Sequence, residues 1–91
     1  MGAPEMSTEN DPVVILDEAE EVRAIAELLL VTGGFDAVAF ASIEEGLGTI
    51  IRFAPRRVTV ILSSMLAATD QKWFAALLHI TPPARVLLCC T

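Results

Sequence analysis

The sequence predicts a single α/β domain with a parallel β-sheet, on three observations. The chain has 91 residues, which is enough for one domain with one core. Apolar residues make up 54% of it and aromatic residues only 5%, so we expect most of the chain to fold around aliphatic side chains. From Pro12 onward, short apolar runs alternate with helical patterns, which is typical of consecutive βα units. The expected order is β-α-β-α-β-α-β over residues 12–91, after a disordered N-terminal tail over residues 1–11.

The first half of the domain is expected to form two βα units. Residues 13–16 (VVIL) are a continuous apolar run that ends at an acidic pair, which is typical of a central strand covered on both faces. Residues 19–31 predict an amphipathic helix, which the two glycines at 33–34 can end in a left-handed conformation. Residues 35–40 predict a second strand nearer an edge. The core-facing stripe of the helix is expected to be Val22, Ile25, Ala26 and Leu29.

The second helix has a start signal and a stop signal. Ser42 followed by Glu45 reads as a capping box, and Pro55 ends the helix. Residues 58–62 (VTVIL) then predict a β-branched, apolar third strand. The apolar face of this helix is expected to be Leu47, Ile50, Ile51 and Ala54.

A third helix and a fourth strand complete the pattern. Thr69 or Asp70 can cap the helix, and the proline pair at 82–83 prevents it from continuing. Residues 86–89 (VLLC) predict a strand of the buried type. The apolar stripe of the helix is expected to be Trp73, Phe74, Leu77 and Leu78.

Charge and composition exclude several classes of function. Six Lys and Arg residues against twelve Asp and Glu residues give a net charge of −6, so nucleic acid and anionic membranes are poor partners. No apolar run reaches the ~18 residues that span a bilayer, and the N-terminus does not resemble a signal peptide, so we expect a cytoplasmic protein. The two cysteines are adjacent and the single histidine, His79, lies ten residues before them. We expect neither a disulfide framework nor a zinc site.

Candidate site residues follow the expected strands, because sites in parallel α/β sheets form at the carboxyl ends of the strands. The residues at these positions are Asp17, Glu18, Ser63, Ser64, Cys90 and Thr91. The acidic pair at 17–18 could hold a hard divalent cation, which prefers oxygen ligands. Alternatively, the same pair complements the dipole of the helix that follows it.

Residues 13–62, VVILDEAEEVRAIAELLLVTGGFDAVAFASIEEGLGTIIRFAPRRVTVIL, resemble the receiver domain of two-component response regulators. The shared pattern is a strand ending in an acidic pair, an amphipathic helix, an aromatic-led second strand, a capped helix, a proline-containing turn and an apolar strand. The resemblance extends over residues 13–91. It implies a three-layer, flavodoxin-like sheet of order 2-1-3-4 that lacks the family's fifth βα unit.

Carried over residue by residue, the resemblance implies a degenerate site. Asp17 and Glu18 match the acidic pair that binds magnesium in the family, but Ser63 stands where the phosphate-accepting aspartate belongs. Met65 matches the residue whose backbone carbonyl completes the metal shell, and Cys90 stands where a switch Thr or Ser is usual. A hydroxyl without an adjacent base cannot replace the carboxylate nucleophile. We therefore expect no aspartyl phosphate, weak or absent magnesium binding and no resident cofactor.

The fourth strand is expected to form an interface. Without a fifth unit it becomes an edge that carries none of the charges or prolines that protect edges from pairing. Trp73 and Phe74 either face a partner beside it or belong to the core. We expect a homodimer through this region, since two-fold contacts are the commonest in small proteins. Its strand residues are Val86, Leu87, Leu88 and Cys89.

These expectations favour a protein that is not an enzyme: a receiver-like interaction module in signal transduction, which binds itself or a signalling protein. One alternative is a magnesium-dependent phosphoryl switch that still uses Asp17 and Glu18, with Asp70 as a substitute acceptor. The other alternative is a regulator phosphorylated by a serine kinase at Ser63 or Ser64, similar to anti-sigma-factor antagonists.

Overall fold

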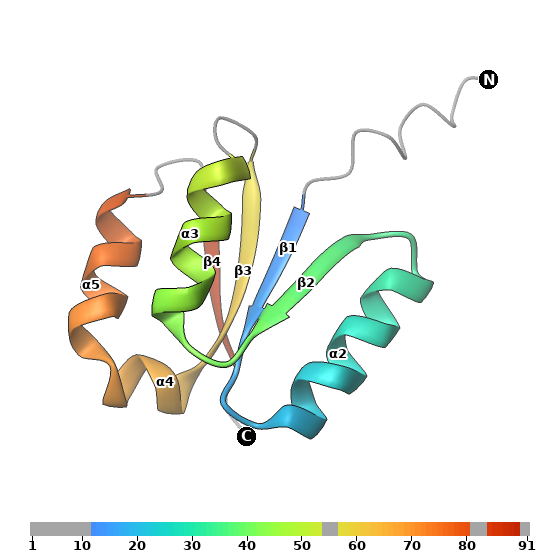
Figure 1. Ribbon diagram of the computed structural model, residues 1–91, viewed down its shortest axis with the longest axis horizontal. Coiled ribbons are helices and arrows are strands. Elements are labelled where there is room, and N and C mark those ends of the chain that lie inside the picture. Colours follow the sequence, from blue (N-terminus) through green and yellow to red (C-terminus); the bar gives the residue numbers. More distant parts are fainter. Residues whose placement is uncertain (1–11, 54–56, 81–83, 90–91) are drawn as a thin grey trace.

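A computed structural model describes residues 12–53, 57–80 and 84–89, which form a parallel sheet with helices on both faces (Figure 1). The strand order is β2-β1-β3-β4. This confirms the predicted α/β class and the flavodoxin-like order 2-1-3-4. The strands are β1 (Pro12–Leu16), β2 (Asp36–Phe40), β3 (Val58–Ser63) and β4 (Ala84–Cys89). The helices are α2 (Glu20–Thr32), α3 (Ile43–Phe53), α4 (Ser64–Thr69) and α5 (Gln71–Ile80).

Strand β1 lies in the middle of the sheet and is buried along its whole length. Val14 is aligned with Val38 of β2 on one side and with Val60 of β3 on the other. A parallel strand covered on both faces needs apolar side chains at every position, which explains the continuous run of the sequence. The prediction of a central first strand and of a second strand at an edge is confirmed.

The larger core lies between the sheet and helices α3, α4 and α5. The Ser42 hydroxyl accepts a hydrogen bond of 3.2 Å from the Glu45 backbone N–H, so the predicted N-cap of α3 is confirmed. Ile51 is 51% exposed, so its assignment to the core face of α3 was wrong. The buried residues of this core are Val14, Leu16, Ile43, Leu47, Ile50, Val58, Val60, Leu62, Leu66 and Leu77.

Helix α2 lies on the opposite face of the sheet, beside β1 and β2 (Figure 1). Its half-buried residues Ala26 and Leu30 pack against a smaller cluster of buried residues, and no residue of α2 is itself buried. Val22, Ile25 and Leu29 of the predicted core-facing stripe are exposed, so for these three residues the prediction was wrong. The helix turns a different side toward the sheet than its apolar periodicity alone indicates.

The turn from α2 into β2 uses the two glycines as predicted. The N–H of Gly33 donates to the carbonyl of Leu29, and the N–H of Gly34 donates to that of Val31, both at 3.0 Å. Gly34 has a φ of 96°, a conformation that favours glycine because a Cβ atom would crowd the backbone. The stop signal for the first helix is therefore confirmed.

The segment after β3 forms two helices where the sequence indicates one. Helix α4 begins directly at Ser64, and the N–H of Asp70 donates to the carbonyl of Leu66 at its end. The Asp70 carbonyl in turn accepts from the N–H of Phe74 at 2.9 Å, which opens α5. Leu77 is fully buried, whereas Leu78 is 55% exposed and was wrongly placed in the apolar stripe.

Several predictions concern residues outside the part that the structure describes. These are the N-terminal tail over residues 1–11, Ala54 and the helix end at Pro55, the proline pair at 82–83, and Cys90 and Thr91. Within the described residues, no helix has the length and apolar character needed to cross a membrane.

Candidate functional site

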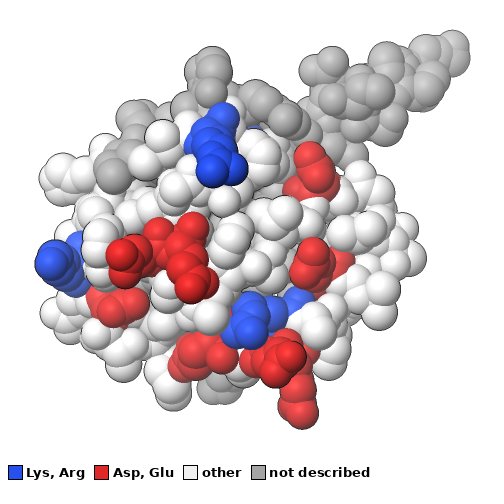
Figure 2. All heavy atoms as spheres, in the orientation of Figure 1, with Lys and Arg blue, Asp and Glu red and all other residues white. Residues whose placement is uncertain are grey.

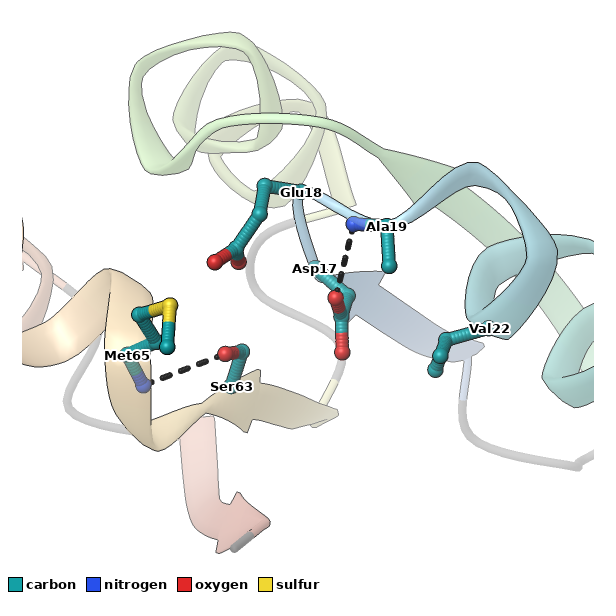
Figure 3. Close-up of a pocket in the computed structure, with 6 residues that line it drawn as sticks. All are labelled: Asp17, Glu18, Ala19, Val22, Ser63 and Met65. Atoms are coloured by element: carbon teal, nitrogen blue, oxygen red, sulfur yellow. Dashed lines mark hydrogen bonds between the residues drawn. The ribbon is translucent and has the colours of Figure 1, made fainter. Parts of the chain in front are cut away.

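The candidate site is an open pocket at the carboxyl ends of β1 and β3 (Figure 3). The acidic pair comes from the turn after β1, and the opposite wall comes from the junction between β3 and α4. The structure thus brings four of the predicted site residues together. The lining residues are Asp17, Glu18, Ala19, Val22, Ser63 and Met65.

Asp17 is a buried carboxylate that stabilises the turn into α2. Only 7% of the residue is exposed, and its Oδ1 atom accepts a hydrogen bond of 2.9 Å from the Ala19 N–H. Its backbone N–H donates to the carbonyl of Phe40 at 3.2 Å, which ties the turn to the end of β2. One of the two carboxylate oxygens is thus used by the chain itself, and Glu18 beside it is exposed.

Arg23 stabilises the same turn, and we did not single it out from the sequence. Its Nη1 atom donates to the carbonyl of Asp17 at 3.0 Å and to the carbonyl of Glu18 at 3.2 Å. The contacts reach back from the first turn of α2 to residues six and five positions earlier, before the helix begins, so no i to i+4 pattern in the sequence indicates them. The arginine places a cation beside the backbone of the acidic pair.

Ser63 is the N-cap of α4. Its Oγ atom accepts hydrogen bonds from the N–H groups of Met65 at 3.2 Å and Leu66 at 3.4 Å, and only 9% of the residue is exposed. A hydroxyl oxygen has two lone pairs, and both are used by these donors. To act as a nucleophile, this oxygen would have to break its hydrogen bonds to the N–H groups of α4. The position that the family resemblance assigns to a phosphate acceptor is therefore occupied by a structural hydroxyl.

Met65 does not offer its carbonyl to the pocket as the resemblance implies. The residue lies in the first turn of α4, and its carbonyl accepts a hydrogen bond of 2.9 Å from the Thr69 hydroxyl. Its side chain, 60% exposed, lines the pocket instead. The early start of α4 explains the difference, because carbonyls of a helix point along its axis toward the C-terminus.

The residues at the pocket do not fit a magnesium ion. Magnesium requires near-ideal octahedral geometry and dehydrates reluctantly, so it needs well-placed oxygen ligands. Here one oxygen of Asp17 and the hydroxyl of Ser63 are already bonded within the chain. In the part of the chain that the structure describes, no group of three or more His, Cys, Asp and Glu side chains could hold a metal ion.

The surface around the strand ends is acidic. Figure 2 shows Asp and Glu side chains at several places on this face, including its lower part, where the strands end in Figure 1 and where Lys or Arg side chains also lie. The excess follows from the net charge of −6. Two carboxylates at one pocket repel a phosphoryl donor, which carries negative charge itself. The electrostatics of the pocket thus disfavour the approach of a phosphate group.

The residues expected at an interface fall into two groups. Trp73, Phe74 and Val86 are half-buried and pack against the larger core, so the core alternative for the two aromatic residues agrees with their positions. Leu87 and Leu88 are 48% and 55% exposed. Cys89 is exposed as well, and β4 is an edge of the described sheet.

The remaining candidates lie away from the pocket. Asp70 joins α4 to α5, where its backbone bonds to both helices. His79 is exposed in the last turn of α5, and its Nδ1 atom lies 3.2 Å from the carbonyl of Ala75. Neither residue is among those that line the pocket.

Comparison with known proteins gives no match: no family model, no curated protein and no solved structure is similar to this chain. The resemblance to receiver domains therefore rests on the residues and on the order of elements along the chain. A function for this protein has to be argued from its own side chains and surfaces.

Proposed function

We propose that this protein is a receiver-like interaction module of cytoplasmic signal transduction that does not accept a phosphoryl group. It acts by docking, either to a second copy of itself or to a signalling protein as an adaptor. It is not an enzyme in this proposal, because binding replaces the transfer chemistry of the family that it resembles.

The hydrogen bonding of Ser63 carries the proposal. The side chain at the end of β3 is a hydroxyl whose oxygen already accepts from two backbone N–H groups of α4. An acyl phosphate needs a carboxylate at this position, and a serine needs an adjacent base to become a nucleophile. Position 63 holds no carboxylate, and no histidine is among the residues that line the pocket. Among residues 12–53, 57–80 and 84–89, Asp17 and Glu18 have no third metal-ligating side chain beside them, so they support neither phosphoryl transfer nor a firm magnesium site.

Exposed apolar side chains support the docking part of the proposal. Leucines 87 and 88 of the edge strand and several residues of α2 are about half exposed or more. Leu87 lies on the face of the sheet that carries α2, and Leu88 lies on the other face. Exposed apolar surface is common at interaction sites on small proteins. The two alternatives draw less support. A serine kinase would have to reach Ser63, which is buried, or Ser64, which is half-buried in the first turn of α4. A magnesium switch would have to use the incomplete acidic set.

The test is intact-mass measurement after incubation with magnesium and a small acyl-phosphate donor. We expect the mass of the wild-type chain to stay unchanged. The Ser63→Asp variant supplies the missing carboxylate and keeps a good N-cap residue, so we expect it to gain affinity for magnesium in titration calorimetry. Ser64→Asp is the matched control, because it adds the same charge one residue further along, away from the pocket lining.

Two results would contradict the proposal. A phosphoryl adduct on the wild-type chain that hydroxylamine removes would support the switch through Asp17, Glu18 or Asp70. An acid-stable adduct on Ser63 or Ser64 after treatment with a serine kinase would support the regulator similar to anti-sigma-factor antagonists.

A further inference from the structure

The face of the sheet that carries α2 is only partly covered. Ile61 of β3 is aligned with Ile15 of β1, and Leu87 of β4 is aligned with Ile61, so these side chains point to the same face. Ile15 and Ile61 belong to the small cluster under α2. Leu87, one strand further out, is 48% exposed. We call the surface of Ile61 and Leu87 the floor.

One side of α2 forms a wall beside this floor. Val22 lines the pocket together with Ser63 and Met65, so its side of the helix faces β3. Leu29 lies two turns further along on the same side. The two residues are 38% and 66% exposed.

Two further apolar residues of α2 point away from its own sheet. Ile25 is 60% and Leu28 is 66% exposed. At 100° per residue Leu28 lies opposite Ala26 and Leu30, the residues that pack against the sheet, and Ile25 lies between Leu28 and Leu29 around the helix. Packing within one chain does not explain an apolar outer side on a helix without a single buried residue.

We propose that a second copy of this chain covers the floor, with α2 of each subunit lying over β3 and β4 of the other. The proposal rests on the proposed function and deepens it by naming the partner and the surface. A two-fold axis parallel to the strands places the two α2 helices side by side between the two sheets. Ile25 and Leu28 then meet the partner's floor, while Val22 and Leu29 meet the partner's α2.

The exposed apolar area is close to what such a contact requires. From their exposed fractions, the side chains of the wall, the floor and the outer side of α2 leave on the order of 400 Å² of apolar surface open. A standard interface takes about 450–500 Å² of apolar area from each partner. The surface is also self-complementary, because each copy supplies both a projecting helix and an open floor.

Charge agrees with this arrangement. Arg85 is exposed at the amino end of β4, and its alignment with Thr59 puts it on the same face as Leu87. A two-fold axis parallel to the strands brings it to the C-terminal end of the partner's α2. Helix α2 has no basic residue in its last turn, so no side chain of that turn places a positive charge near its terminal carbonyls. An arginine at this end is favourable for the helix dipole.

Sedimentation equilibrium of the full chain and of three variants tests the proposal. We expect the wild type to be a dimer at micromolar concentration. Leu28→Glu buries a charge at the contact and should weaken dimerisation by about 100-fold or more. The matched control Leu78→Glu changes a leucine on α5 that is 55% exposed, against 66% for Leu28, and should leave the dimer unchanged. Arg85→Glu should weaken it by about two- to fivefold, and less so in high salt.

Cross-linking tests the direction of the helices. Cys89 is exposed and lies on the same face as Leu87. We expect Glu21→Cys, in the first turn of α2, to form a disulfide with Cys89 of the partner subunit. Thr32→Cys, at the other end of the helix, should not form one.

Several outcomes would overturn the proposal. These are a wild-type monomer, a Leu28→Glu variant that dimerises like the wild type, loss of the dimer in Leu78→Glu, or cross-linking through residue 32 instead of 21. Circular dichroism of each variant separates a lost contact from a lost fold. None of these results depends on phosphoryl transfer. A failed dimer test would therefore refute only the proposed dimer, whereas a phosphoryl adduct on the wild type would refute the proposed function.

Discussion

The two faces of the sheet differ in how well helices cover them. On one face, α3, α4 and α5 bury a large cluster that includes Ile50 and Leu77, exposed by only 2% and 0%. On the other, α2 alone covers a small cluster around Ile15, and every residue of that helix keeps some contact with solvent. Both sides use aliphatic residues at helical spacing. Burial therefore depends on how many elements cover a face of the sheet, in addition to the apolar pattern of each element.

Truncating one leucine on each face should give the largest difference. Leu77→Ala removes a fully buried side chain of α5 and should lower the free energy of unfolding by about 2–5 kcal/mol. Leu30→Ala removes a half-buried side chain of α2 and should lower the free energy of unfolding by about 1–2 kcal/mol, because the folded chain buries less apolar area of this leucine than of Leu77. Urea denaturation followed by circular dichroism measures both values. Equal losses would show that the two faces contribute alike.

Two glycines of α3 sharpen the contrast within a single helix. A Cβ atom at Gly46 would collide with the Leu16 side chain, whereas at Gly48 it would meet nothing within 4 Å. Gly46→Ala should therefore destabilise the protein by about 1–3 kcal/mol through overpacking. Gly48→Ala should stabilise it by up to about 1 kcal/mol, because alanine favours the helix. Thermal unfolding of the pair is the measurement, and stabilisation by both variants would contradict the close packing at Leu16.

The cap of α4 should give the smallest effect. Ser63→Ala removes the acceptor for the N–H groups of Met65 and Leu66 and should cost about 1 kcal/mol. Ser63→Thr keeps a hydroxyl acceptor at this position without adding a charge beside Asp17 and Glu18, and should stay within about 0.5 kcal/mol of the wild type. Urea titrations at neutral pH compare the two variants. A loss as large for threonine as for alanine would contradict the capping role of the hydroxyl.

The sequence predicts the strands well because their signal is local. The apolar runs at β1 and β3 and the cap at Ser42 all appear at their predicted places. The side of α2 that faces the sheet could not be predicted from local signals. Val22, Ile25 and Leu29 have the spacing of a core stripe, but spacing alone does not say whether a neighbouring element lies beside the helix to cover them. Whether such a neighbour is present depends on the tertiary structure.

The site was predicted in its location but only partly in its detail. The rule that sites lie at strand ends places Asp17, Glu18 and Ser63 at one pocket, as the structure does. Helix α4 was not predicted, and neither were the roles of Ser63 as its cap and of the Met65 carbonyl as a partner of Thr69. Ser63 followed by helix-forming residues is an N-cap signal that could have indicated this helix.

The lack of buried residues in α2 has a consequence for how the protein opens. Local unfolding starts in elements with few buried contacts, so α2 and the edge strand β2 should detach from β1 before the side with α3 and α5 does. A second copy that bound α2 as proposed would bind only the closed form and would suppress this opening by mass action. Association and local folding of this half of the molecule would then be one linked equilibrium.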